Sequence, residues 1–153
     1  MAHVELSLSE TFPAAPDTVG PAESTSALGH WAATVAVAPE PCLVLDTDAR
    51  IVVASHSFCA LLRLGDPAGV AGRYLLDGVL RLVDFTAARG RLTEVETAKI
   101  PPLLALSSGR LARGLMRVHD GADDGLDATV DAIATPLWDG TEVVGSLTFC
   151  SPI

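Results

Sequence analysis

Residues 41–64 read PCLVLDTDARIVVASHSFCALLRL, and this stretch contains strand, turn, strand and helix signals in succession. The apolar residues 43–45 and the β-branched residues 51–53 predict two short strands. Residues 46–49, DTDA, predict the tight turn between them, because aspartate side chains accept hydrogen bonds from the backbone two residues on. Ser55 is placed to cap a following helix, and residues 58–64 carry apolar side chains at helical spacing.

The chain of 153 residues is long enough for one domain with its own core, and 49% of its residues are hydrophobic. Its apolar runs are too short to cross a bilayer, and no basic segment precedes an apolar one. We therefore expect a cytoplasmic protein without a membrane partner. The bias toward arginine over lysine, with many Ala, Leu, Gly and Val residues, is typical of a GC-rich bacterial gene.

The formal net charge is -9, and an acidic chain repels phosphate backbones, so nucleic-acid binding is not expected. Cys42, Cys59 and Cys150 are isolated and lie among apolar neighbours. Without a C-x-x-C pair they predict neither a disulfide framework nor a zinc site, and we interpret them as small buried hydrophobic residues.

The first part of the chain divides at two composition changes. Residues 1–24 are rich in Ser, Pro, Ala, Glu and Thr, which predicts a flexible acidic tail. Residues 25–38 predict a flanking helix, with Leu28, Trp31 and Val35 on one side, and Pro39 prevents its continuation. Residues 39–153 then form the predicted domain.

The middle of that domain reads as a series of short helices. Residues 79–85 are apolar at helical spacing and predict a helix. Thr93 and Glu96 have the spacing of a capping box. A further helix is predicted after Pro101 and Pro102, and Gly109 is its expected left-handed cap.

Three strands are predicted at the end of the chain. Residues 112–119 and 126–137 alternate between apolar and polar side chains, and residues 143–150 form the last strand. The segments 120–125 and 138–141 are hairpin signals, because both combine aspartate with glycine.

The order of these elements resembles a PAS domain over residues 39–151. The resemblance is carried by residues 43–64, by GRYLLD at 72–77 and by DATVDAIATPLWDGTEVVGSLTFCSPI at 127–153. It implies an α+β fold in which helices pack on one face of a five-stranded antiparallel sheet, in strand order 2-1-5-4-3, preceded by an N-terminal helix. It also implies a non-enzymatic sensor or interaction module rather than a catalyst.

The residues favour no particular cofactor. Flavin-binding PAS domains of the light-sensing type use a cysteine in an NCRFLQ-like helix and side-chain amides, whereas this chain has no Asn or Gln. Haem-binding PAS domains use a histidine on the helix before the third strand, and residues 93–108 contain none. A haem or flavin sensor stays as an alternative, with no cofactor predicted.

Other chemistry has weaker support in the sequence. His119 and the aspartates of residues 120–124 could in principle hold a cation, but their Gly-rich setting is typical of a solvated turn, so no metal site is predicted. Ser55 and His56 are adjacent at a helix start and cannot face each other, so no catalytic residue is predicted. A small uncharacterised enzyme stays as a second alternative.

Two sets of residues are the candidate sites. The first is a core pocket wall that could hold a small apolar ligand: Val44, Val53, Phe58, Leu62, Leu104, Met116, Val130 and Leu147. The second is a surface for a homodimer or for a partner protein that carries the output: Leu28, Trp31, Val35, Leu115, Ile133 and Val144. Leu115 and Ile133 carry this second prediction, because they are apolar among polar outward-facing residues.

Overall fold

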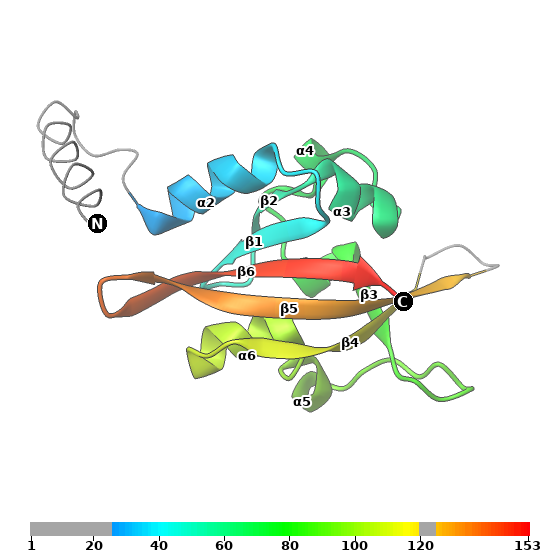
Figure 1. The fold of residues 1–153 in the computed structure, drawn as a ribbon. Coiled ribbons are helices and arrows are strands. Elements are labelled where there is room, and N and C mark those ends of the chain that lie inside the picture. Colours follow the sequence, from blue (N-terminus) through cyan, green and yellow to red (C-terminus); the bar gives the residue numbers. More distant parts are fainter. Residues whose placement is uncertain (1–25, 120–124) are drawn as a thin grey trace, which may run out of the picture.

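A single antiparallel sheet with helices on both sides makes up the protein (Figure 1). The computed structural model describes residues 26–119 and 125–153. The strands are β1 (Cys42–Asp46), β2 (Ile51–Ala54), β3 (Arg81–Val83), β4 (Ala112–His119), β5 (Asp127–Asp139) and β6 (Glu142–Pro152). The helical segments are α2 (Ala27–Ala36), α3 (His56–Leu61), α4 (Pro67–Val70), the single turn η3 (Leu75–Val79), α5 (Glu94–Thr97) and α6 (Pro101–Ser108).

The strand order is β2-β1-β6-β5-β4-β3. Without the short β3, this is the predicted order 2-1-5-4-3, which is therefore confirmed. The last two strands form a long hairpin, paired from Val130 with Pro152 to Asp139 with Glu142. In Figure 1 this hairpin, orange and red, crosses the middle of the sheet and joins the first strands to the later ones.

The opening hairpin and helix form as their residues predict. Asp46 Oδ1 accepts hydrogen bonds from the backbone N–H groups of Asp48 and Arg50, at 2.9 and 3.0 Å. Ser55 Oγ caps α3 by accepting from Phe58 N at 3.2 Å, and it also accepts from Cys42 N at 3.0 Å. Since Cys42 begins β1, this buried hydroxyl joins the helix start to the first strand.

The sheet has two differently covered faces. We call the face under α2 the outer face, where Val35 packs with Val44 and Leu147. We call the opposite face the inner face, where α3, α4 and η3 bury Phe58 and Leu75 against the strands and α6 packs over β5. The largest of the three hydrophobic clusters lies on the inner face.

The predicted helix at residues 79–85 is wrong. Gly78 has φ +80° and Asp77 is also non-helical, so the chain leaves η3 extended and pairs with β4 as strand β3. Arg81–Val83 pair with the backbone of β4, and this strand pairing outweighs the helical spacing of the apolar residues.

The other local predictions in the middle of the chain are confirmed. Thr93 and Glu96 form the capping box of α5, with Thr93 N donating to Glu96 Oε2 at 2.8 Å. Gly109 ends α6 in a left-handed conformation at φ +67°. The flanking helix is present as α2, whereas the predicted tail, residues 1–24, lies outside the described residues. In the part of the chain that is described, no helix is long and apolar enough to span a membrane.

Candidate functional site

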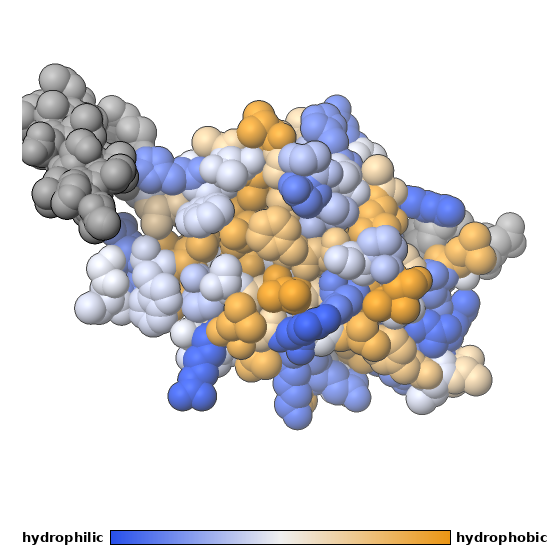
Figure 2. Space-filling view, viewed as in Figure 1, coloured by the Kyte–Doolittle hydropathy of each residue, from blue (hydrophilic) through white to orange (hydrophobic). Residues whose placement is uncertain are grey.

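Part of the outer face is left uncovered by α2. The helix packs over β1 and β2 and touches only part of β5 and β6. Beyond it, Leu115, Ile133 and Phe149 are exposed by 52, 36 and 42%. Figure 2 shows this side of the molecule, where hydrophobic side chains gather over β5 and β6 with hydrophilic ones between them. We call Leu115, Ile133 and Phe149 the outer apolar patch.

The register of the strands fixes the geometry of this patch. Ile133 on β5 is paired with Phe149 on β6, so these two side chains are direct cross-strand neighbours. On its other side Ile133 is paired with Arg113 on β4, and Leu115 is paired with Asp131. The outer apolar patch therefore extends over three strands.

An ion pair divides the patch. Arg113 binds Asp131 in a bidentate manner, with Nε to Oδ1 at 3.2 Å and Nη2 to Oδ2 at 2.6 Å. The hydrogen bonds from Arg113 hold the pKa of the Asp131 carboxyl below its usual value. The residue pairs Arg113–Ile133 and Leu115–Asp131 form the four corners of a square on β4 and β5. Arg113 and Asp131 occupy one diagonal of this square, so their ion pair lies between Leu115 and Ile133 on the other diagonal.

The predicted interaction surface is only partly exposed. Trp31, Leu115 and Ile133 are exposed, as that prediction requires. Val35 is only 1% exposed in the cluster beneath α2, so its placement on a free surface is wrong, whereas Leu28 and Val144 are partly buried against the same cluster. They fill the contact that attaches α2 to the sheet.

Sequence reasoning missed Phe149. The signal that could have found it is its position two residues after Leu147, which places both side chains on the same face of β6. Leu147 is covered by α2, whereas Phe149 lies beyond that cover.

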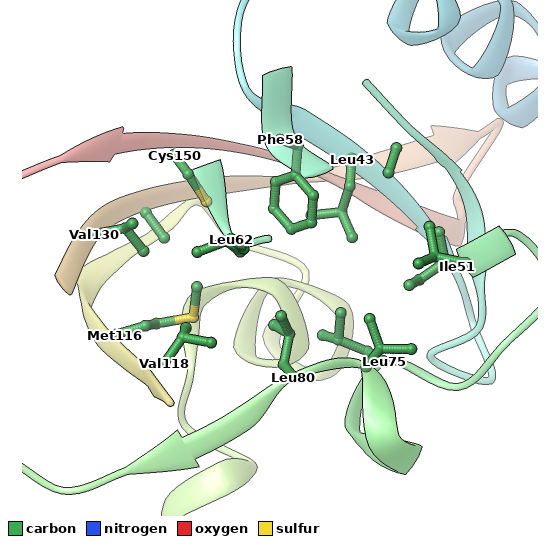
Figure 3. Close-up of a cluster of buried hydrophobic side chains, with 14 of the residues drawn as sticks. Leu43, Ile51, Phe58, Leu62, Leu75, Leu80, Met116, Val118, Val130 and Cys150 are labelled. Atoms are coloured by element: carbon green, nitrogen blue, oxygen red, sulfur yellow. The ribbon is translucent and has the colours of Figure 1, made fainter. Parts of the chain in front are cut away.

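The inner face holds a filled hydrophobic cluster. Figure 3 shows the Phe58 ring from α3 beside Leu43 and facing the centre of the cluster. Met116 and Val130 enter from β4 and β5 and are at most 2% exposed. Four predicted pocket residues are brought together here: Phe58, Leu62, Met116 and Val130. Binding of an apolar ligand by this cluster stays a prediction.

The other four predicted pocket residues lie elsewhere. Val44, Val53 and Leu147 belong to the cluster under α2, on the opposite face from Phe58, so grouping them with it is wrong. For Val44 the cause is that Cys42 to Leu45 are all buried, and a strand covered on both faces has no polar residues to show which face each side chain is on. Leu104 lies on α6 and is 37% exposed.

A charged cluster lies where β4 ends and β5 begins. The Asp127 side chain is only 6% exposed, and its Oδ1 lies 3.0 Å from His119 Nδ1. Its Oδ2 forms ion pairs with Arg117 at 2.9 Å and Arg89 at 3.6 Å, although neither contact has hydrogen-bond geometry. The hydrogen bond with His119, followed by these two arginines, lowers the pKa of Asp127.

The reactive side chains are placed as structural groups. Burial raises the pKa of the Cys42 and Cys59 thiols, and it raises that of Cys150 to about 12. Ser55 is buried in its capping role, while His56 is exposed. Among the described residues, no three His, Cys, Asp or Glu side chains are grouped so as to hold a metal ion.

Solved structures with this architecture come from several organisms. A PAS domain of Colwellia psychrerythraea superposes with a TM-score of 0.56 at 16% identity, covering 82% of this chain and 96% of that one. The PAS domain of the fruit-fly ELK potassium channel has a TM-score of 0.58 at 15% identity, with the same coverage. At such identities the superpositions show the fold alone.

A longer protein also matches. VqmA of Vibrio cholerae, described as a dimer with a target DNA and a LuxR-type receptor, superposes with a TM-score of 0.55 at 16% identity. The match covers 81% of this chain but 50% of VqmA, so this chain spans about half of that protein. No family model matches the sequence, and no curated protein matches it significantly.

Proposed function

We propose that this chain, which has the PAS fold, is a signalling module that acts through protein contacts, and that its outer apolar patch binds a second copy of the chain. The observation that carries the proposal is the exposure of Leu115, Ile133 and Phe149 together on one sheet face. Large apolar side chains that are exposed together on one face of a protein mark interaction surfaces.

The charges on this face favour a second copy over an unrelated partner. In a twofold dimer the same surface is present on both sides of the interface. Arg113 and Asp131 are adjacent and of opposite charge. Across a twofold axis, Arg113 of one copy can therefore face Asp131 of the other, while Leu115 and Ile133 of the two copies pack together. The patch is therefore complementary to itself in both charge and hydrophobicity.

The position of α2 supports the same interface. The helix covers Val44 and Leu147 but leaves Leu115, Ile133 and Phe149 exposed, and Trp31 on this helix is itself 41% exposed. VqmA, which shares the fold, is described as a dimer.

Sedimentation equilibrium tests the proposal. We expect the wild-type protein to have the mass of a dimer and Ile133→Glu to have that of a monomer, because a carboxylate at the centre of the patch would have to be buried. Val95→Glu is the matched control, since Val95 on α5 is also exposed, by 67%, but lies outside the patch. A monomeric wild type, or a dimeric Ile133→Glu, would contradict the proposal.

A further inference from the structure

Two adjoining open cavities lie beside the edge strand β3, away from the outer apolar patch. The larger, of about 440 Å³, is bounded by η3, β3, the segment after β3 and the end of β4. The smaller, of about 230 Å³, shares Gly78, Arg81 and His119 with it and extends toward α3 and α4. The larger cavity has a volume in the range of small-molecule sites, about 300–1,000 Å³.

The side chains that line these cavities are strongly cationic, although the whole chain has a net charge of -9. Arg81, Arg89, Arg91 and His119 line the larger one, and the smaller one is lined by Arg63 and Arg73 together with Arg81 and His119. Within the described residues, no aspartate or glutamate lines either cavity. Positive charge is therefore concentrated here rather than spread over the surface.

The lining arginines differ in how their charge is compensated. Arg89 is held by Asp127 and donates to the carbonyl oxygen of Gly125 at 3.1 Å. In contrast, the guanidinium groups of Arg81 and Arg91 have no hydrogen-bond or ion-pair partner in the described part of the chain. These two charges are available to a ligand.

Two neighbouring groups are held in place around them. His119 engages Asp127 through Nδ1, which fixes the orientation of its ring. Arg73 donates to the carbonyl oxygen of Asp77 at 3.3 Å and lies so close to Gly78 that an added Cβ there would be 3.1 Å from its Nη2. The absence of a side chain at Gly78 thus leaves room for this guanidinium at the shared border of the two cavities.

We propose that the larger cavity binds a small organic anion, a carboxylate or phosphate ester with a short apolar group. Guanidinium groups bind the oxygens of carboxylates and phosphates through paired hydrogen bonds, which assigns the anionic end to Arg81 and Arg91. Leu76 and Leu82, which also line this cavity, form the surface for the apolar group. This site is independent of the dimer interface proposed above, because it uses other residues.

Isothermal titration calorimetry with three ligands of the same chain length tests this site: hexanoate, hexyl phosphate and 1-hexanol. We expect at least one of the two anions to bind with a dissociation constant of about 1 mM or lower, and hexanol to give no heat of binding. Arg81→Gln and Arg91→Gln should each weaken binding of that anion about tenfold, since each removes a charge-assisted pair. Arg110→Gln, a loss of the same charge outside both cavities, should leave binding unchanged.

Amide chemical-shift mapping of the wild type with the same ligands locates the site without any substitution. Shifts centred on Arg81, Arg91 and His119 are expected. The proposal is overturned if neither anion binds, if hexanol binds as well as the anions, if the shifts lie elsewhere, or if Arg110→Gln weakens binding as much as Arg81→Gln does.

Discussion

Arg113 and Asp131 form a bidentate ion pair between Leu115 and Ile133, on the part of the sheet that α2 leaves uncovered. An isolated pair in this exposed position contributes little to the stability of a monomer. Its place among exposed apolar side chains gives it a second role, because it sets the charge pattern that a docking surface must match.

The titration of Asp131 should report this pair directly. Hydrogen bonds from Arg113 lower the pKa of Asp131, so the carboxylate should stay ionised below the usual range for aspartate. Because the folded-state pKa is lowered, the pair's stabilising effect is present above the unfolded-state pKa and is lost as the pH falls through the folded-state value. Carbon-detected NMR should show the Asp131 pKa rising toward its usual value in Arg113→Gln; an unchanged pKa would contradict the geometry.

The inner cluster should depend strongly on Phe58. This ring is fully buried, so Phe58→Ala should reduce the free energy of unfolding by about 3–5 kcal/mol. Phe85→Ala is the matched control, because Phe85 is 57% exposed and its loss should change stability by less than about 0.5 kcal/mol. Urea denaturation measures both, and equal effects would show that Phe58 is not part of a close-packed core.

Ser55 should contribute more than an ordinary helix cap. Its hydroxyl accepts from two buried N–H groups, Phe58 and Cys42, and donates to the carbonyl oxygen of Glu40 at 2.8 Å. Ser55→Ala leaves these groups unpaired, and each unsatisfied buried group costs about 1–3 kcal/mol. Ser26→Ala removes only the exposed cap of α2, worth about 1 kcal/mol. In thermal unfolding we therefore expect Ser55→Ala to unfold at a clearly lower temperature than Ser26→Ala.

The cysteines should be unreactive while the protein is folded. With the pKa of Cys150 at about 12 and those of Cys42 and Cys59 also raised, almost no thiolate is present at neutral pH. Ellman's reagent should detect no rapidly reacting thiol in the native protein and all 3 thiols in denaturant. A fast native reaction would mean that at least one of these side chains is accessible.

Much of the fold could be predicted from local chemistry in the sequence. The turn at Asp46, the caps at Ser55 and Thr93 and the end of α6 at Gly109 each depend on one side chain or one glycine and its nearest backbone. Such signals are complete within a few residues, so the sequence alone reveals them.

What could not be predicted depends on contacts between distant segments. Residues 81–83 form a strand because the edge of β4 lies beside them. Val44 faces α2 rather than Phe58, and its strand β1 is buried on both faces, so no alternation of polar residues shows which way it points. The arginines beside β3 are likewise brought to one cavity by strand contacts, because Arg81 is paired with His119 and Arg91 is bridged to Val83.

The dimer on the outer apolar patch is the central claim, and contacts between labelled and unlabelled copies test it most directly. In an isotope-filtered NOE experiment on a mixture of 13C-labelled and unlabelled protein, signals arise only between protons of different copies. We predict intermolecular signals from the methyl groups of Ile133 and Leu115 to the other copy, including its Phe149 ring. Intermolecular signals confined to residues outside the outer face, such as Val95, or none at concentrations where the protein sediments as a dimer, would contradict the account.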